Sequence, residues 1–241
     1  LNEESSIKLG YNRNYQYLHM LTNNTSSTPT DTWIMSSNNV KPQIADQVSL
    51  GYFRNFNENM FESSIEVYYK DMQNVIDYRN GANVFQNELL EGDLIYGGGR
   101  AYGVEFLVKK NKGKLTGWLG YTLARSEIKF EEINDNTWFP ARQDRIHEIN
   151  LVAMYRLNSK LSLSANFIYY TGDAVTFPSG SYEVDGKIVP YYTERNGYRM
   201  PDYHRLDLSV TWYNKKTAKF ESNWNFSLFN AYGRENAFSI D

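Results

Sequence analysis

The stretch HEINLVAMYRLNSKLSLSANFIYY, residues 147–170, decides the fold class of this chain. Residues 147–157 alternate between an apolar face, which carries Leu151, and a face of more polar side chains, and residues 161–170 repeat the alternation. A period of two is typical of a β-strand with one apolar and one polar face, whereas a helix repeats every 3.6 residues or so. Residues 158–159 have the composition of a tight turn. The stretch therefore predicts an antiparallel β-hairpin.

The same alternation recurs along the whole chain, and no stretch shows a convincing helical period. The segments that fit the strand pattern are 6–18, 44–56, 60–70, 101–110, 114–126, 147–157, 161–170, 205–213 and 219–230. About nine strands without helices predict an all-β fold. We expect these strands to be antiparallel and to follow one another up and down.

Short and long links alternate between the predicted strands. The short links are 57–59, 111–113, 158–159 and 215–217, and the long links are 20–43, 72–100, 128–142 and 172–203. Membrane β-barrels join their strands in this way, with short turns on the periplasmic side and long loops outside the cell. A soluble sandwich or jelly roll has no physical reason to sort its links by length. The pattern predicts an up-and-down transmembrane β-barrel with all four long links at one extracellular rim.

The composition suits a wall with one apolar face and one wet face. Of the 241 residues 16% are aromatic, none is cysteine, and the net charge is -3. The lack of cysteine excludes disulfides and Cys-ligated metal sites, and the acidic balance argues against a nucleic-acid surface. No apolar run reaches about 18 residues, so we expect no transmembrane helix. A barrel strand crosses a membrane with only about 10 residues.

About nine strands do not complete a bacterial barrel, which normally has an even number of strands. An open sheet in hydrocarbon leaves unpaired backbone groups along both edges, at a cost of several kcal/mol for each group. The chain also begins with Leu1 and shows no signal peptide. We therefore expect residues 1–241 to be part of one larger barrel domain. Its first and last strands should pair with chain outside this segment or with a second copy.

One face of the predicted strands should contact lipid. The residues expected on it are Leu119, Tyr121, Leu123, Leu151, Ala153, Tyr155, Leu163, Phe167, Leu208, Val210 and Trp212. A structure that packed these side chains between two sheets would instead support a soluble sandwich.

Five stretches resemble TonB-dependent outer-membrane receptors of the Bacteroidetes type, and they occur in that family's order. They are RAYGVEFLVKKNKGKLTGWLGYTLARSE at 100–127, FPARQDRIHEINLV at 139–152, TGDAVTFPSG at 171–180, NGYRMPDYHRLDLS at 196–209 and SLFNAYGRENAFSI at 227–240. No single stretch is decisive, but the ordered set is fairly specific. Together they span residues 100–240 and cover 80 of those 141 residues.

The resemblance implies a large plugged barrel of the 22-stranded class, of which the plug, the TonB box, the early strands and the closing strands are absent here. It implies a location in the outer membrane of a Gram-negative bacterium and TonB-coupled uptake of a scarce nutrient: a siderophore, cobalamin or an oligosaccharide. The implied partners are outer-membrane lipid, this ligand and, through the missing plug, the TonB complex. A surface lipoprotein partner would indicate glycans. The alternatives are a passive porin-like or adhesin barrel and a soluble carbohydrate-binding β-protein.

The long links carry the candidate ligand-binding residues, and the link at 172–203 is the strongest of the four. The candidates are Trp33, Trp138, Phe177, Tyr182, Tyr191, Tyr192, Arg195 and Tyr198. Rigid aromatic side chains offer a stacking surface for sugar rings or a siderophore, and nearby charges can orient the ligand. The same aromatic residues also suit an interfacial belt or packing between loops. Both interpretations stay open.

No motif points to an enzyme, a metal site or a cofactor. His147-Glu148 lacks the second histidine of a zinc helix, since Leu151 occupies that position and the segment alternates as a strand. The loops hold no Ser-His-Asp order, nucleophile elbow or paired carboxylates. Arg205 and Asp207 share one strand face, and we expect them to form an ion pair on the lumen wall rather than a transport path.

Overall fold

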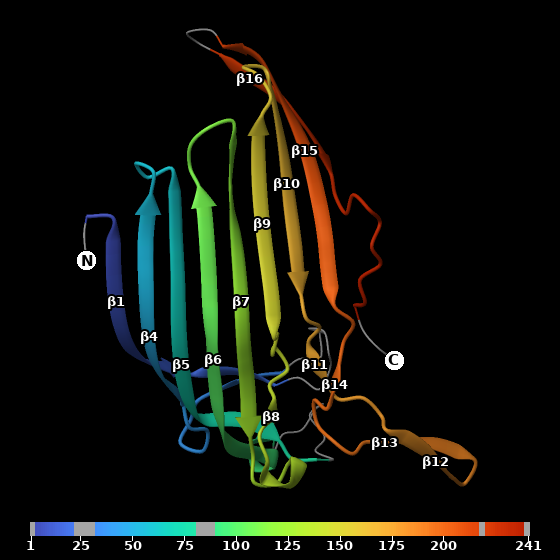
Figure 1. Cartoon of the computed structure of the whole chain (residues 1–241). Coiled ribbons are helices and arrows are strands. Elements are labelled where there is room, and N and C mark those ends of the chain that lie inside the picture. The colour runs from blue at the N-terminus through green and yellow to red at the C-terminus, as the bar shows by residue number, and fades with distance from the viewer. Residues whose placement is uncertain (1–2, 22–31, 81–89, 217–219, 239–241) are drawn as a thin grey trace.

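The computed structural model describes residues 3–21, 32–80, 90–216 and 220–238. They form one antiparallel sheet of ten strands and three small two-stranded sheets. Nine of the ten follow one another in chain order, with the short strand β8 beside β7 (Figure 1). The nine are β1 (Ser5–Gln16), β4 (Gln43–Phe56), β5 (Phe61–Tyr78), β6 (Leu94–Lys110), β7 (Leu115–Lys129), β9 (His147–Arg156), β10 (Leu161–Tyr170), β15 (Tyr203–Lys216) and β16 (Glu221–Leu228). The prediction of an all-β, up-and-down partial barrel is confirmed.

Strands β5 and β6 extend further than the alternation predicts, into the link expected at 72–100. Their pairing shifts register between Met72 and Val75, and Asn74 adopts a positive φ of 57° there. Such a bulge changes which side chains face each side of the sheet. The alternation seen in 60–70 is therefore lost beyond the bulge although the strand continues.

The short and long links lie at opposite ends of the sheet, as predicted (Figure 1). The turn between β4 and β5 uses Asn57, Glu58 and Asn59 at positive φ, and the turn between β6 and β7 uses Gly113 at 102°. Asparagine and glycine tolerate this left-handed backbone better than most residues. The turn chemistry thus closes hairpins at one end and leaves the long links together at the other.

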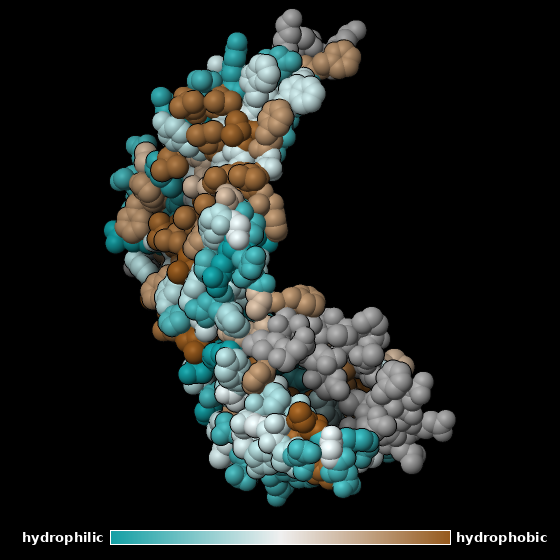
Figure 2. All heavy atoms as spheres, turned by 90° about the vertical axis from the view of Figure 1, so that its right-hand side faces the viewer, coloured by the Kyte–Doolittle hydropathy of each residue, from teal (hydrophilic) through white to brown (hydrophobic). Residues whose placement is uncertain are grey.

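The predicted lipid-facing residues lie on one face of the sheet, which we call the apolar belt. Cross-strand partners share a face, and Leu119 pairs with Leu151, which pairs with Phe167. Leu151 and Trp212 are 38% and 48% exposed, and in the described part of the chain no second sheet covers them. Figure 2 shows a curved shell with apolar side chains gathered over the sheet and a largely hydrophilic loop end. This arrangement is a barrel wall and not a sandwich.

The long links have secondary structure of their own. Their described residues contain two short 3-10 helices and several short strands. These elements are β2 (Leu18–Leu21), β3 (Thr32–Met35), η1 (Leu90–Asp93), η2 (Asn134–Asn136), β8 (Phe139–Pro140), β11 (Ala174–Val175), β12 (Gly180–Val184), β13 (Lys187–Tyr191) and β14 (Tyr198–Arg199). None of the helices found in the described ranges is long and apolar enough to cross a membrane.

The buried clusters lie at the loop end, where the links meet the ends of the strands. One cluster joins Leu21, Val40, Leu90 and Leu94, so it ties the β2–β3 hairpin to the link before β6. A second cluster joins Ile95, Phe130, Ile133 and Phe139. Apolar burial therefore holds the links against one another at the loop end.

Strands β1 and β16 form the two edges of the sheet. Within the described residues each pairs on one side only, and the two are not joined to each other. This confirms that the segment does not close into a small barrel. Pairing of these edges with further chain stays a prediction.

Candidate functional site

A cavity of about 390 Å³ opens at the loop end, on the face of the sheet opposite the apolar belt. All four long links contribute to its wall. The lining residues are Met20, Leu21, Val75, Ile76, Asp77, Tyr78, Ile128, Ala141, Arg142, Gln143, Ala174, Val175, Thr176, Arg195 and Asn196. About half of these residues are apolar and the others are polar or charged, so the wall offers both apolar contact and hydrogen-bonding groups to a small molecule. We call this space the loop cavity.

Arg195 anchors the 172–203 link to the end of β5. Its Nη1 lies 2.8 Å from an Asp77 carboxylate oxygen and donates to the Tyr78 carbonyl at 2.9 Å, while Nη2 donates to the Asn80 side-chain oxygen at 2.9 Å. The guanidinium also covers the Tyr78 ring at 4.6 Å. Because the Arg195 and Asp77 side chains are both mostly buried, this pair is shielded from solvent. It fixes one wall of the loop cavity.

Two asparagines lock the same link to the link at 128–142. The Asn134 side chain donates to the Arg195 carbonyl and accepts from the Arg195 N–H, both at 2.9 Å. The Asn196 side chain donates to the Pro140 carbonyl at 3.0 Å. Backbone groups in a loop lack the regular hydrogen bonds of a sheet, and side-chain amides can serve as their partners instead. Three links are thereby joined around one cavity.

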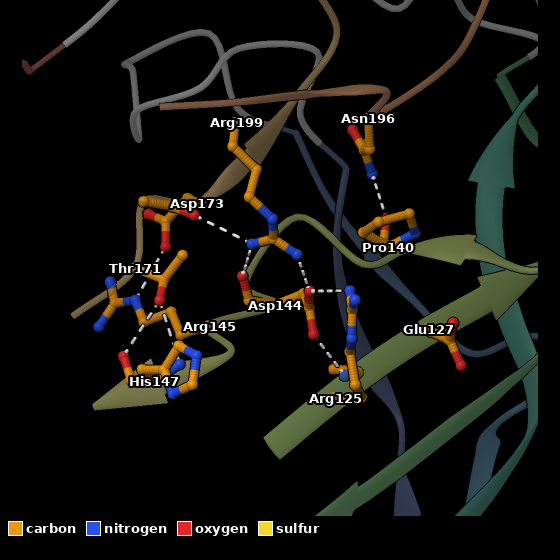
Figure 3. A network of polar contacts seen from close by, with 12 residues as sticks. Arg125, Glu127, Pro140, Asp144, Arg145, His147, Thr171, Asp173, Asn196 and Arg199 are labelled. Carbon is orange, nitrogen blue, oxygen red and sulfur yellow. Dashed lines mark hydrogen bonds and ion pairs between the residues drawn. The ribbon is translucent and has the colours of Figure 1, made fainter. Parts of the chain in front are cut away.

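Asp144 holds a second connection between the links and the wall (Figure 3). Its buried carboxylate accepts the Ser126 N–H at 2.6 Å, where β7 has run past its pairing with β9. It also forms an ion pair with Arg199 and lies 3.5 Å from Arg125. Arg199 donates in addition to the Asp144 and Gly172 carbonyls at 2.7 and 3.1 Å. Asp144 therefore completes the strand edge and positions Arg199.

A cation and an aromatic pair extend this network along the inner wall. Arg145 lies 2.8 Å from Asp173 and 3.8 Å above the Tyr170 ring, which stacks on Tyr203 at 4.6 Å. Arg145 also lines part of a second cavity of about 410 Å³. The polar inner face agrees with the interior of a membrane barrel. The predicted Arg205–Asp207 pair is confirmed at 2.9 Å.

His19 is the buried histidine of the loop end. It lies on β2 beside the cavity residues Met20 and Leu21, and its ring is 3.2 Å from the Ser36 hydroxyl. Burial lowers the pKa of His19 below its ordinary value, because the charged imidazolium loses hydration.

Of the eight candidate ligand-binding residues, Arg195 alone lines the loop cavity. Phe177 and Tyr198 form a tilted ring pair at 5.3 Å. Tyr182 and Tyr191 are exposed on one face of the β12–β13 hairpin. Trp33 and Tyr192 are also exposed.

Trp138 lies apart from the other candidates. It stacks on Arg100 at 4.3 Å, and Arg100 shares the outer face with Tyr102 on β6. An aromatic side chain at that position fits the interfacial belt. The aromatic candidates therefore do not gather into one surface, and their role in ligand binding stays a prediction.

Several polar site residues were not anticipated from the sequence, among them Asp77, Asn134, Arg142, Asp144 and Asn196. The sequence gives little indication of their role, since each is a single polar residue in or beside a long link. Their partners are remote, as Arg195 and Tyr78 are separated by 117 positions. Contacts at that separation carry no local pattern.

Comparison with known proteins gives one family match, described as "TonB dependent receptor-like, beta-barrel", which covers residues 1–232. Among curated proteins no relative matches.

Solved structures match in fold. The ferric-catecholate import receptor Fiu from E. coli K12 is 17% identical, with a TM-score of 0.63 over 98% of this chain and 30% of that one. The ferripyoverdine receptor of the Pseudomonas aeruginosa outer membrane is 11% identical, with a TM-score of 0.63 over 97% and 28%. The FrpB iron transporter from Neisseria meningitidis is 11% identical, with a TM-score of 0.59 over 97% and 32%. The chain thus spans about a third of the length of the structures it matches.

Proposed function

This chain belongs to the TonB-dependent receptor β-barrel family, and from that premise we propose that it forms part of an outer-membrane receptor that takes up a scarce nutrient with energy from TonB. The family and its matched structures are receptors and transporters, not enzymes. The ligand would bind at the extracellular end, and TonB would act through a plug encoded elsewhere in the full-length protein. The present segment would supply part of the barrel wall and four of the extracellular loops.

The observation that carries the proposal is the loop cavity. It draws on all four long links, and buried polar contacts such as Arg195–Asp77 hold those links in place. A passive pore needs no such construction at its mouth, whereas a receptor needs a preformed site that faces its lumen.

The open edges of the sheet indicate that the receptor contains further barrel strands. We propose that residues 1–241 belong to one larger barrel domain in the outer membrane of a Gram-negative bacterium, with β1 and β16 paired to further strands. The five ordered stretches between residues 100 and 240 support the Bacteroidetes type. The ligand classes that remain are a siderophore, cobalamin and an oligosaccharide, the last with a surface lipoprotein as partner.

Uptake by the full-length receptor tests this function. A host lacking the gene would be supplied with iron as ferric siderophores, with cobalamin or with oligosaccharides, each as the limiting nutrient. Uptake of one class should require both the gene and TonB. Uptake that needs the gene but continues after loss of TonB would identify a passive barrel and overturn the proposal.

A further inference from the structure

The end of the sheet that carries the short turns is strongly basic. The short turns and the strand residues beside them contain ten Lys and Arg residues and only three Asp and Glu residues. The whole chain has 25 Lys and Arg and 28 Asp and Glu residues, so the net charge of -3 combines a basic turn end with an acidic remainder. The segments counted are 54–62, 108–116, 155–162 and 213–221, and their described residues lie at one end of the sheet (Figure 1). We call this region the turn end.

The turn end lies on the periplasmic side of the membrane. Bacterial membrane barrels join their strands by short turns in the periplasm and by long loops outside the cell. This chain belongs to a family of such barrels, and its short and long links are sorted in the same way. The basic segments therefore lie where the barrel wall meets the periplasmic leaflet.

Part of the turn end faces the lipid. Lys110 lies two residues beyond Val108, which pairs with the belt residue Leu119. Side chains two residues apart in a strand share a face, so Lys110 lies on the face of the apolar belt. Lys110 pairs with Phe61, and Phe61 pairs with Phe56. Cross-strand partners share a face, so both rings also face the lipid.

Each of these two phenylalanines has a cation beside its ring. The Lys110 Nζ lies 5.9 Å from the centre of the Phe61 ring, and the Arg54 guanidinium lies 4.8 Å from that of Phe56. Arg54 is two residues from Phe56 and therefore shares its face. Aromatic rings gather at the boundary between hydrocarbon and headgroups in membrane barrels, and long cationic side chains extend from there into the headgroup layer. Both cations are thus placed at the level of lipid phosphates.

The protein itself does not neutralise the exposed cations of the turn end. Arg54, Lys114 and Lys160 are exposed, and in the described part of the chain none of them has a carboxylate within 4.0 Å. At the loop end, in contrast, several arginines of the candidate site are held in ion pairs. The cations of the turn end are therefore available to an anionic partner.

We infer that the turn end binds the phosphate groups of anionic phospholipids in the periplasmic leaflet. Each Lys or Arg close to an anionic membrane surface strengthens the attraction about fivefold. The cell-wall polymer of the periplasm is also anionic, but it lies beyond the turns. Lipid is favoured because Lys110 and Arg54 continue the face of the apolar belt, which only lipid covers.

The test measures the lipid selectivity of the purified full-length receptor in phosphatidylcholine bilayers. Electron paramagnetic resonance distinguishes spin-labelled lipids held at a protein from lipids in the bulk bilayer. The label would be carried either by phosphatidylglycerol, which is anionic, or by phosphatidylcholine, which has no net charge. The ratio of their association constants reports the preference for an anionic headgroup.

Two variants of the turn end separate charge from structure. The triple variant Arg54→Gln/Lys114→Gln/Lys160→Gln removes three exposed cations from three hairpin ends. The triple variant Arg54→Lys/Lys114→Arg/Lys160→Arg changes the same side chains but keeps their charge. Correct folding of each variant would be checked by its heat-dependent mobility in gel electrophoresis.

The matched control removes the same charge from the loop end. It is Arg234→Gln/Lys41→Gln/Lys187→Gln, which again replaces one Arg and two Lys that are exposed. A general effect of net charge would act equally in both triple Gln variants, whereas a site at the turn end would respond in one of them.

We expect the wild type to prefer phosphatidylglycerol about fivefold at low salt. The Gln variant of the turn end should lose at least about half of this preference, while the charge-conserving variant and the loop-end control should keep it. Sodium chloride should weaken the preference of the wild type, because salt screens exposed charges. No preference in the wild type, or an equal preference in the Gln variant of the turn end, would overturn the inference.

Two further arms distinguish lipid from other anions. Inorganic phosphate that reduces the preference more than sodium chloride of equal ionic strength would indicate a site for soluble phosphate and would overturn the assignment to lipid. Binding to isolated peptidoglycan through the same three residues, without a lipid preference, would assign the turn end to the cell wall instead. None of these measurements involves a nutrient or TonB, so their outcome leaves the proposed uptake function unaffected.

Discussion

Replacing Asp144 should release the 172–203 link from the barrel wall. The side chain of Asp144 is 0% exposed, and it joins the Ser126 N–H to the guanidinium of Arg199. Asp144→Asn removes the charge and keeps an oxygen that can accept the Ser126 N–H. Asp144→Ala removes both interactions. The two variants therefore separate the ion pair from the strand-edge hydrogen bond.

The structure sets the magnitude of each effect. Removing one partner of a fully buried ion pair costs about 3–5 kcal/mol. Here the Arg199 and Arg125 side chains are 26% and 42% exposed and can turn to water, so we expect about 2 kcal/mol for Asp144→Asn. Asp144→Ala adds about 1 kcal/mol for the lost acceptor. These values correspond to about 30-fold and more than 100-fold increases in local opening.

Hydrogen exchange measured by mass spectrometry on the full-length receptor reports this opening directly. Peptides that cover Ser126 and Arg199 should exchange faster in the order wild type, Asp144→Asn, Asp144→Ala. The control is Asp173→Asn, because the Asp173 and Arg145 side chains are 34% and 36% exposed. An exposed pair of this kind contributes up to about 1 kcal/mol, so exchange should rise by less than about fivefold. Exchange at Ser126 that is unchanged in Asp144→Ala would refute the role assigned to Asp144.

Three further predictions follow from the faces, the buried histidine and the projecting hairpin. Leu151→Arg on the apolar belt should destabilise the barrel by about 2–4 kcal/mol, while Asn150→Arg on the inner face should be tolerated; the yield of folded receptor in membranes distinguishes them. The β2–β3 hairpin should lose stability as pH falls below 6.5, because burial lowers the pKa of His19 and folding then favours the neutral ring. Its hydrogen exchange, corrected for intrinsic rates, should depend less on pH in His19→Gln, and an equal dependence would exclude His19 as the cause. Deleting 180–191 removes Tyr182 and Tyr191 but keeps the Arg195 anchor, and it should weaken ligand binding at least tenfold if those aromatics contact the ligand, whereas unchanged binding would remove the hairpin from the site.

The sequence indicates some residues of the candidate site and leaves others unmarked. Arg195 was identified as a charge in a long link, and it does line the loop cavity. Trp138 was a candidate of equal standing, yet it stacks on Arg100 at the outer face. Nothing in a loop sequence tells which side of the wall an aromatic ring will cover, because that depends on the neighbouring strand. The composition of the long links thus indicates which segments lie at the rim. It does not separate residues that face the ligand from residues that face the membrane interface.

The sequence by itself determined the barrel wall, that is, its strands, its hairpins and the end at which each link lies. A period of two and the order of turns act over a few residues, so the hairpin at 147–170 and the sorting of links were readable directly. Only the tertiary structure decided the site, because its contacts join residues far apart in the chain. Strand register and loop packing bring Asp77 to Arg195 and Ser126 to Asp144. The bulge near Asn74 shifts the register of β5 against β6, so the alternation of the sequence does not predict the pairing beyond it.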